Sequence, residues 1–231
     1  MKSIKEQNKK SWDPKWDQIF SSQEWGKYPS EHIIQFIARN FYKINEENRK
    51  HIKILEVGCG TGANLWFIAR EGFSAFGVDG SEVGIEKARK RMSNEGLDVS
   101  LNIADIIDLP FPDMFFDAVI DNECIYSNSY ENSDIIMKEI FRTMKSDGMF
   151  YSRTFSDSMY IGNTSAPNIN LEYSNVSSGP LEGKGFVRLS SRETIKSLYG
   201  KYFKILSIDY SEYSVQNGAN VVHEWNIICK K

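Results

Sequence analysis

IKILEVGCGTG, residues 52–62, is the stretch of sequence around which the rest of the chain is organised. Apolar residues dominate its first half, which fits a short buried strand, and three glycines then follow at alternate positions, Gly58, Gly60 and Gly62. Because glycine lacks a Cβ, such a loop can turn sharply and bring backbone N–H groups against a ligand. A helix that begins after the loop directs its positive N-terminal end at the same place. The stretch therefore predicts a ligand-binding strand, loop and helix.

Length, charge and cysteine spacing limit the classes of function. The chain has 231 residues, a net charge of -3 and 41% hydrophobic residues, which predicts a single domain over residues 1–231. No basic stretch is long enough to follow a nucleic-acid backbone, so we expect no nucleic-acid partner. No apolar run reaches the roughly 18 residues of a membrane span and no apolar segment follows the charged start, so we expect a cytoplasmic protein without a membrane partner. The three cysteines are far apart, and we expect neither a disulfide nor a metal site.

Strand-like and helix-like segments alternate along most of the chain. Strands are expected at 52–57, 74–78, 99–105, 116–122 and from residue 148, with helical periodicity between several of them. This alternation predicts an α/β fold with a doubly wound parallel sheet. Two further strand-like runs, 204–215 and 221–231, flank an Asn- and Gly-containing loop typical of hairpins, so we expect an antiparallel hairpin to close the chain.

Two segments stand apart from this alternation. Residues 1–45 form an N-terminal arm, helical in part, whose first 30 residues carry Trp12, Trp16, Trp25 and Tyr28. These aromatic side chains either pack the arm onto the domain or cover a bound ligand. The second segment, residues 156–185, is rich in Ser, Asn, Gly and Pro, and an insertion of about 30 residues is typically a functional lid or a disordered segment. We expect it on the substrate side of the site.

Acidic residues stand where the second and third strands end. Ligands of open α/β sheets bind beyond the carboxyl ends of the strands, so Asp79 and Asp105 should converge on the glycine loop. Asp79 lies about 20 residues after the first glycine, the separation at which a carboxylate accepts hydrogen bonds from ribose hydroxyls. Asp105 is placed to accept from the exocyclic amine of adenine, with Ile106 against the ring. These residues predict an adenosine-containing cofactor.

Glu56 discriminates between two such cofactors. The loop also satisfies the dinucleotide fingerprint, which keeps an NAD-dependent oxidoreductase open as an alternative. A dinucleotide, however, carries an anionic pyrophosphate that a carboxylate two residues before the loop would repel. S-adenosylmethionine carries a sulfonium and an ammonium, which the same carboxylate attracts. The charge at Glu56 therefore favours S-adenosylmethionine.

At these residues the chain resembles the class I S-adenosylmethionine-dependent methyltransferases. The resemblance runs from about residue 25 to residue 155 and rests on an acidic-x-G-x-G-x-G signature, the acidic residues that end the second and third strands, and the FDAVI segment that leads to Asn122. It implies a Rossmann-like seven-stranded sheet, mostly parallel with an antiparallel C-terminal strand and with helices on both faces. It also implies S-adenosylmethionine as cofactor and S-adenosylhomocysteine as product. The residues it implies in cofactor binding are Glu56, Gly58, Gly60, Gly62, Asp79, Gly80, Ser81, Asp105, Ile106, Asn122 and Glu123.

The acceptor and the general base are less sharply indicated. After the fourth strand the chain reads DNECIY and lacks the Asn/Asp-Pro-Pro-aromatic tetrad of amino-methylating DNA enzymes, so we expect a small-molecule acceptor, a metabolite or a sugar hydroxyl. A hydroxyl acceptor needs a proton acceptor, and five residues near the expected cleft could serve: His223, Glu123, Tyr126, Glu224 and Asp157. The first three are the candidates for the catalytic role. Because no residue stands out as the general base, a second alternative is a non-catalytic protein that binds S-adenosylmethionine.

Overall fold

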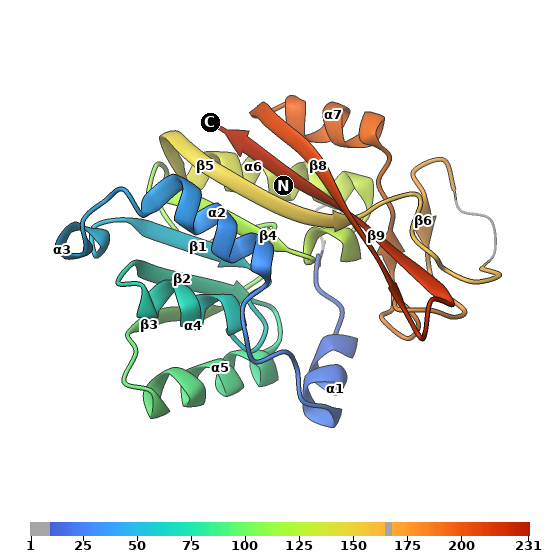
Figure 1. Cartoon of the computed structure of the whole chain (residues 1–231), viewed down its shortest axis with the longest axis horizontal. Coiled ribbons are helices and arrows are strands. Elements are labelled where there is room, and N and C mark those ends of the chain that lie inside the picture. Colours follow the sequence, from blue (N-terminus) through green and yellow to red (C-terminus); the bar gives the residue numbers. More distant parts are fainter. Residues whose placement is uncertain (1–9, 165–167) are drawn as a thin grey trace, which may run out of the picture.

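The computed structural model describes residues 10–164 and 168–231 and contains one seven-stranded sheet (Figure 1). Residues 1–9 of the predicted arm and 165–167 of the predicted insertion lie outside the described residues. The sheet has the order β3-β2-β1-β4-β5-β9-β8, and β9 runs antiparallel to both of its neighbours, β5 and β8. Its strands are β1 (Lys53–Val57), β2 (Ser74–Asp79), β3 (Val99–Ile103), β4 (Phe116–Asn122), β5 (Met144–Phe155), β8 (Lys204–Val215) and β9 (Asn220–Lys230). The predicted fold class is confirmed.

The order of the strands reverses between β1 and β4. From β1 the chain moves outward through β2 to β3, and it then returns to the other side of β1 as β4 followed by β5. All five strands are parallel, so their carboxyl ends lie along one edge of the sheet. A reversal of this kind leaves a crevice at that edge, where open α/β sheets bind their ligands.

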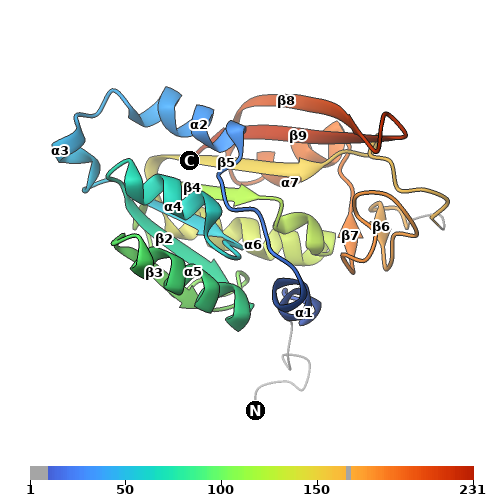
Figure 2. The ribbon, with the colours of Figure 1, turned by 60° about the horizontal axis from the view of Figure 1, so that its bottom comes forward.

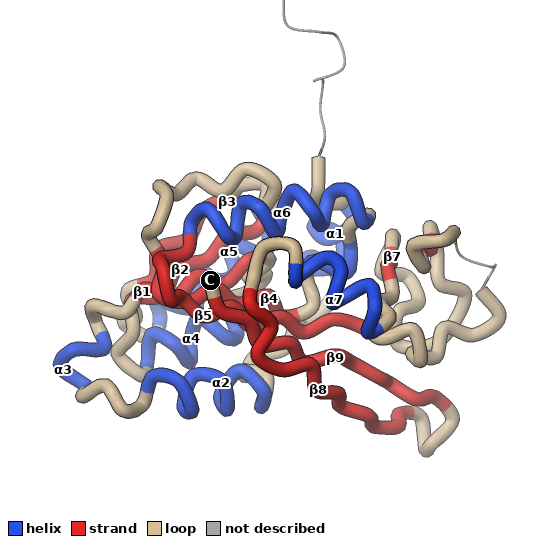
Figure 3. The backbone as a smooth tube through the Cα atoms, turned by 90° about the horizontal axis from the view of Figure 1, so that it is seen from above, coloured by secondary structure: helices blue, strands red, loops and turns tan. Residues whose placement is uncertain are grey.

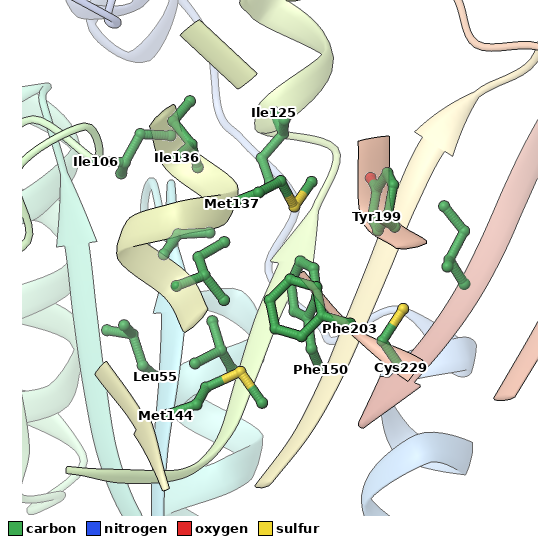
Figure 4. Close-up of a cluster of buried hydrophobic side chains, with 14 of the residues drawn as sticks. Leu55, Ile106, Ile125, Ile136, Met137, Met144, Phe150, Tyr199, Phe203 and Cys229 are labelled. Atoms are coloured by element: carbon green, nitrogen blue, oxygen red, sulfur yellow. The ribbon is translucent and has the colours of Figure 1, made fainter. Parts of the chain in front are cut away.

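Helices cover both faces of the sheet (Figure 3). One face packs against α2 (Glu31–Phe41), α4 (Ala63–Arg70) and α5 (Glu82–Asn94), and the other against α6 (Tyr130–Thr143) and α7 (Arg192–Gly200). Successive residues of β1 alternate between the two cores: Ile54 belongs to the first, and Leu55 and Val57 to the second. Figure 4 shows the second core, in which Met137 of α6 and Tyr199 of α7 lie in one cluster with Leu55.

Three segments extend the domain at the carboxyl edge of the sheet (Figures 1 and 2). Helix α1 (Lys15–Ser22) belongs to the N-terminal arm. The insertion contributes β6 (Glu172–Tyr173), which pairs with β7 (Val187–Arg188) just beyond its end. The apolar side chains of this region form a small core with Tyr126 of the 3-10 helix η2 (Ile125–Ser127) and Val222 of β9. The β8–β9 hairpin projects beyond β5 toward this insertion.

Two elements differ from the expectation from sequence. The polar segment before β1 contains a short helix, α3 (Glu46–Arg49), which begins where the side chain of Asn45 accepts a hydrogen bond from the backbone N–H of Asn48 at 3.1 Å. Strand β5 begins at Met144 and not at Gly148. Met144 continues the apolar spacing of α6, but its backbone is already extended and pairs with Phe116 of β4 across a β-bulge.

None of the helices in the described part of the chain combines the length and the apolar character needed to cross a membrane.

Candidate active site

A cavity of about 450 Å³ lies at the carboxyl edge of the sheet, where the strand order reverses. Its floor is the loop after β1 together with the residues that follow β2 and β4. Its walls come from the N-terminal arm, the insertion and the β8–β9 hairpin. Cavities of this size typically bind one small organic molecule or a cofactor.

Glycines allow the loop after β1 to approach its neighbours closely. Gly58 has φ +66°, and a Cβ built on it would lie 2.1 Å from the Sγ of Cys124. Gly62 has φ +78° and is the N-cap of α4, so the helix begins directly at the cavity. A side chain at either position would be strained in its backbone and would collide with a neighbour. The loop therefore presents mainly backbone to the cavity, as expected from the sequence.

Glu56 brings a buried carboxylate to the cavity. The residue is 3% exposed, and its Oε1 accepts a hydrogen bond from the Nδ2 of Asn64 at 2.6 Å. Its Oε2 is buried and has no hydrogen-bond partner among the described residues. Burial, together with the nearby carboxylates of Asp79 and Asp121, raises the pKa of Glu56 to about 8, although the hydrogen bond from Asn64 opposes this rise. A cation bound in the cavity would supply the missing partner.

Asp79, at the end of β2, organises the loop as well as facing the cavity. Its Oδ2 accepts from the backbone N–H of Gly60 and its Oδ1 from that of Ser81, both at 2.8 Å. Each carboxylate oxygen keeps a second lone pair for a ligand. Gly80 also lines the cavity and packs against the indole of Trp12, which leaves no room for a Cβ. Ser81 is fully buried and caps α5, because its Oγ accepts a hydrogen bond from the backbone N–H of Gly84. Its contribution is structural in this conformation.

Asp105, after β3, is engaged by the N-terminal arm. Its Oδ2 accepts from the backbone N–H of Ser11 at 2.7 Å, and its Oδ1 accepts from the hydroxyl of the same serine and from the N–H of Ile107. Ile106 lines the cavity and Asp105 does not. A ligand amine would therefore either take the remaining lone pair of Oδ2 or replace Ser11.

Asn122, the last residue of β4, and Glu123, which follows it, face the cavity from the side of β5 and β9. The Oδ1 of Asn122 is buried and has no partner within the described structure. The Oε1 of Glu123 lies 3.2 Å from the Nε of Arg153, and the same Nε donates to the Oε2 of Glu224 at 2.9 Å. Burial raises the pKa of Glu123 to about 7; Arg153 opposes this rise and Glu224 adds to it.

Of the three catalytic candidates, two line the cavity and one does not. Glu123 and Tyr126 line the cavity, where Tyr126 packs edge-to-face against Phe155 with ring centroids 4.8 Å apart. Burial raises the pKa of Tyr126 far above the neutral range, so its hydroxyl is suited to hydrogen bonding and not to accepting a proton as a phenolate. His223 does not line the cavity: its ring stacks on Tyr210, because side chains alternate along β9 and those of Val222 and Glu224 face the cavity.

Three segments that are far apart in the sequence form the walls of the cavity over the glycine loop. The insertion contributes a short stretch near Leu181 and Lys184, and the hairpin contributes Tyr213 and Val222. The arm contributes five aromatic side chains: Trp12, Trp16, Phe20, Trp25 and Tyr28. The ammonium of Lys184 lies 4.5 Å from the ring centroid of Trp25, which joins insertion and arm. Among the described residues, no group of three or more His, Cys, Asp or Glu side chains is arranged to hold a metal ion.

Several residues of the site were not predicted from the sequence. Asn64 carries a local signal, since it stands on the first turn of the helix that begins at the glycine loop. Arg153 carries none: Glu224 was expected near the site, but the two residues are 71 positions apart and are brought together only by the pairing of β5 with β9. Glu224 is 1% exposed, and Arg153 is the ion-pair partner of its buried carboxylate.

Comparisons with known proteins identify related sequences and folds. A sequence profile described as "Methyltransferase domain" matches residues 48–181. The chain is 37% identical over 100 residues to the fatty-acid O-methyltransferase of Mycolicibacterium smegmatis, covering 42% of this chain and 35% of that protein. It is 29% identical over 101 residues to the 2-heptyl-1-hydroxyquinolin-4(1H)-one methyltransferase of Mycobacteroides abscessus, covering 43% and 44%. The chain thus spans less than half the length of these curated relatives.

Solved structures share the fold. The crystal structure of a protein of Methanosarcina mazei described as a SAM-dependent methyltransferase superposes with a TM-score of 0.67 at 21% identity, covering 78% of this chain and 92% of that one. At this identity the likeness concerns the fold alone.

Proposed function

The chain belongs to the methyltransferase-domain family, and from this premise we propose that it transfers the methyl group of S-adenosylmethionine to a small-molecule acceptor. The cofactor, when bound, supplies an electrophilic methyl group on a sulfonium sulfur. The chain's own task is then to bind the cofactor, align the acceptor and exclude water.

The buried and unpartnered Oε2 of Glu56 carries this proposal. The carboxylate lies beside the glycine loop in a site poor in cations, and it requires a cation or a hydrogen-bond donor from a ligand. The ammonium of S-adenosylmethionine meets that need. The pyrophosphate of NAD would bring negative charge to a site that already holds Glu56 and Asp79.

The remaining roles follow the order of the strand ends. We assign the methionine portion to Glu56 and the loop backbone, the ribose to Asp79 and Gly80, and the adenine to Asp105 with Ile106. Asn122 and Glu123 would lie near the transferable methyl group. Ser81 supports this arrangement indirectly by capping α5. The aromatic arm and the insertion would enclose the acceptor within one domain that spans the chain.

A small-molecule acceptor, with a hydroxyl as the methylated group, agrees with the enclosed cavity. Its walls are largely aromatic and apolar, which suits a compact organic molecule better than a polymer. Two relatives are named for small substrates, a fatty acid and a hydroxyquinolone, and these names support the small size of the acceptor without deciding which group is methylated.

Calorimetric titration of the purified protein with S-adenosylmethionine, S-adenosylhomocysteine and NAD tests the proposal. We expect micromolar binding of the first two and none of NAD. Binding of NAD without the other two would favour an oxidoreductase. A protein that binds S-adenosylmethionine yet releases no S-adenosylhomocysteine with any member of a broad metabolite library would fit a non-catalytic binding protein.

A further inference from the structure

Three charged side chains from separate elements meet at the β4–β5–β9 side of the cavity. Glu123 follows β4, Arg153 lies on β5 and Glu224 on β9. Both carboxylates contact the one guanidinium, Glu123 at 3.2 Å and Glu224 through bonds from Nε and Nη2. When both carboxylates are ionised the cluster carries a net charge of one negative unit.

Arg153 has little capacity left for a ligand. Its Nε and Nη2 serve Glu224, and its Nη1 donates to the Oγ of Ser30 at 3.2 Å. Arg153 is also absent from the cavity lining, whereas Glu123 and Glu224 belong to it. The guanidinium therefore stabilises the carboxylates from behind and does not present a positive charge to the cavity.

Glu123 keeps one oxygen away from Arg153. Only its Oε1 contacts the guanidinium. Its carboxyl group also lies within hydrogen-bonding reach of that of Glu224, a contact that raises the pKa of Glu123. Its backbone has φ +59°, in the left-handed region that non-glycine residues rarely adopt, and its N–H donates to the carbonyl of Arg153 at 3.0 Å. Such strained backbone concentrates at functional sites.

This arrangement restricts the chemistry of the acceptor. Carboxylate oxygens only accept hydrogen bonds, so a hydroxyl or an amine is bound favourably, while a second carboxylate is repelled. Next to the two carboxylates stand aromatic and apolar side chains, Tyr126, Phe155, Val222 and Tyr213, the last with its hydroxyl 3.5 Å from the Oε1 of Glu224. The surroundings therefore suit an aromatic or apolar skeleton that carries a hydroxyl or an amine.

We propose that Glu123 and Glu224, held by Arg153, select alcohols, phenols and amines as methyl acceptors and exclude carboxylic acids, and that Glu123 receives the acceptor's proton. This inference rests on the proposed methyltransferase function. The acceptor oxygen or nitrogen forms a bond to the methyl carbon while the carbon–sulfur bond breaks and its electron pair stays on sulfur. The proton leaves the acceptor atom for the Oε2 of Glu123; an amine that enters protonated first gives up one proton to solvent.

The electrostatic surroundings of Glu123 suit this role. Burial raises its pKa to about 7, near the pH at which a general base is most effective. The ionisable groups that surround the carboxylate pair come from β4, η2, β5, β8, β9 and α2. They are Asp121, Tyr126, Tyr151, Arg153, Tyr213, Glu224 and His32.

Binding of three probes with one skeleton tests the selection without turnover. The complex with S-adenosylhomocysteine is titrated at pH 8 with 2-phenylethylamine, 2-phenylethanol and phenylacetate. We expect the amine and the alcohol to bind at least tenfold more tightly than the acid, and the affinity for the amine to rise between pH 6 and pH 8 as Glu123 ionises. Equal or tighter binding of phenylacetate, or binding of none of the three, would overturn the inference.

Glu123→Gln isolates the carboxylate, because it keeps the side-chain volume and leaves Glu224 on Arg153. We expect the variant to lose the pH dependence of amine binding and most of the preference over the acid. Glu212→Gln, an exposed position on β8, is the matched control and should behave as wild type. If Glu123→Gln keeps the wild-type pH dependence, Glu123 is not the group that titrates.

Turnover separates this inference from the function on which it rests. A library of alcohols, amines and carboxylic acids is screened for release of S-adenosylhomocysteine. We expect acceptors only among the alcohols and amines, with kcat at least 100-fold lower in Glu123→Gln. Methylation of a carboxylic acid would refute the selection alone, whereas a protein that neither binds S-adenosylmethionine nor turns over any compound would refute the methyltransferase function.

Discussion

The ionisation of Glu56 should be coupled to cofactor binding. Its pKa near 8 means that the residue is mostly protonated at pH 7 without a ligand, and a bound ammonium or sulfonium lowers that pKa. Binding of S-adenosylmethionine at pH 7 is therefore expected to release close to one proton, and the release should vanish above about pH 9. Calorimetry in buffers of different ionisation enthalpy measures the proton count; a count near zero at pH 7 would contradict the prediction.

Glu56→Gln tests the same linkage in the free protein. Because the folded pKa lies above the ordinary value, the fold binds the proton more tightly than the unfolded chain, so stability falls by about 1.4 kcal/mol per pH unit between pH 5 and pH 8. The variant lacks this decline and should be more stable than wild type at pH 8, although it binds S-adenosylmethionine at least tenfold more weakly. Urea unfolding at several pH values provides the comparison.

A substitution at Asp79 is expected to weaken cofactor binding and to destabilise the fold. Asp79→Asn removes the charge and leaves one of the two N–H groups, those of Gly60 and Ser81, without its acceptor. We expect cofactor affinity to fall tenfold or more and the free energy of unfolding to fall by about 1–3 kcal/mol. Asp108→Asn, at an exposed position near β3, is the control. Unchanged affinity in Asp79→Asn would remove Asp79 from the site.

At the scale of elements, the N-terminal arm covers the end of the cavity near β2 and β3. Trp12 packs on Gly80, and Ser11 bonds to Asp105 from the next position. Trp12→Ala should weaken binding of S-adenosylhomocysteine by roughly 10- to 100-fold, since the loss of a buried aromatic contact costs about 1.5–3 kcal/mol. Trp12→Phe should retain most of the affinity. Equal affinities for wild type and Trp12→Ala would show that the arm packs on the domain without covering the ligand.

A buried arginine just beyond the end of the insertion anchors it. Arg188 of β7 is 1% exposed and donates to the carbonyl of Asn128, the Oγ of Ser133 and the Oγ of Ser190 at 3.0–3.1 Å. Arg188→Met leaves three acceptors without donors and should lower the free energy of unfolding by about 2–4 kcal/mol. Limited proteolysis should then cut residues 156–185 first. Arg188→Lys keeps one charged donor, so its free energy of unfolding should lie between those of wild type and Arg188→Met. If Arg188→Met is cut at the same rate as wild type, Arg188 does not anchor the insertion.

The whole molecule shows which features local sequence can predict. The strand before Gly58 and the hairpin around residues 216–220 were predictable, because an apolar run and its turn residues are neighbours in the chain. Helix α3 has no apolar face, so no hydrophobic periodicity marks it in the sequence and it was not predicted. The contacts of Ser11 with Asp105 and of Arg153 with Glu224 join residues 94 and 71 positions apart, so they depend on tertiary structure that no local pattern encodes.

The cavity walls belong to three segments that meet only in the folded chain, and this predicts a concerted response to ligand. Arm, insertion and hairpin all contact the cavity, so S-adenosylhomocysteine should slow amide hydrogen exchange in all three as well as in the glycine loop. At 100 times its Kd the ligand contributes about 2.7 kcal/mol, which should raise Tm by roughly 5–10 °C for a chain of this length. Mass-spectrometric exchange resolves the segments. Protection confined to the glycine loop and the end of β2 would mean that the walls do not close on the cofactor, and that they act on the acceptor alone.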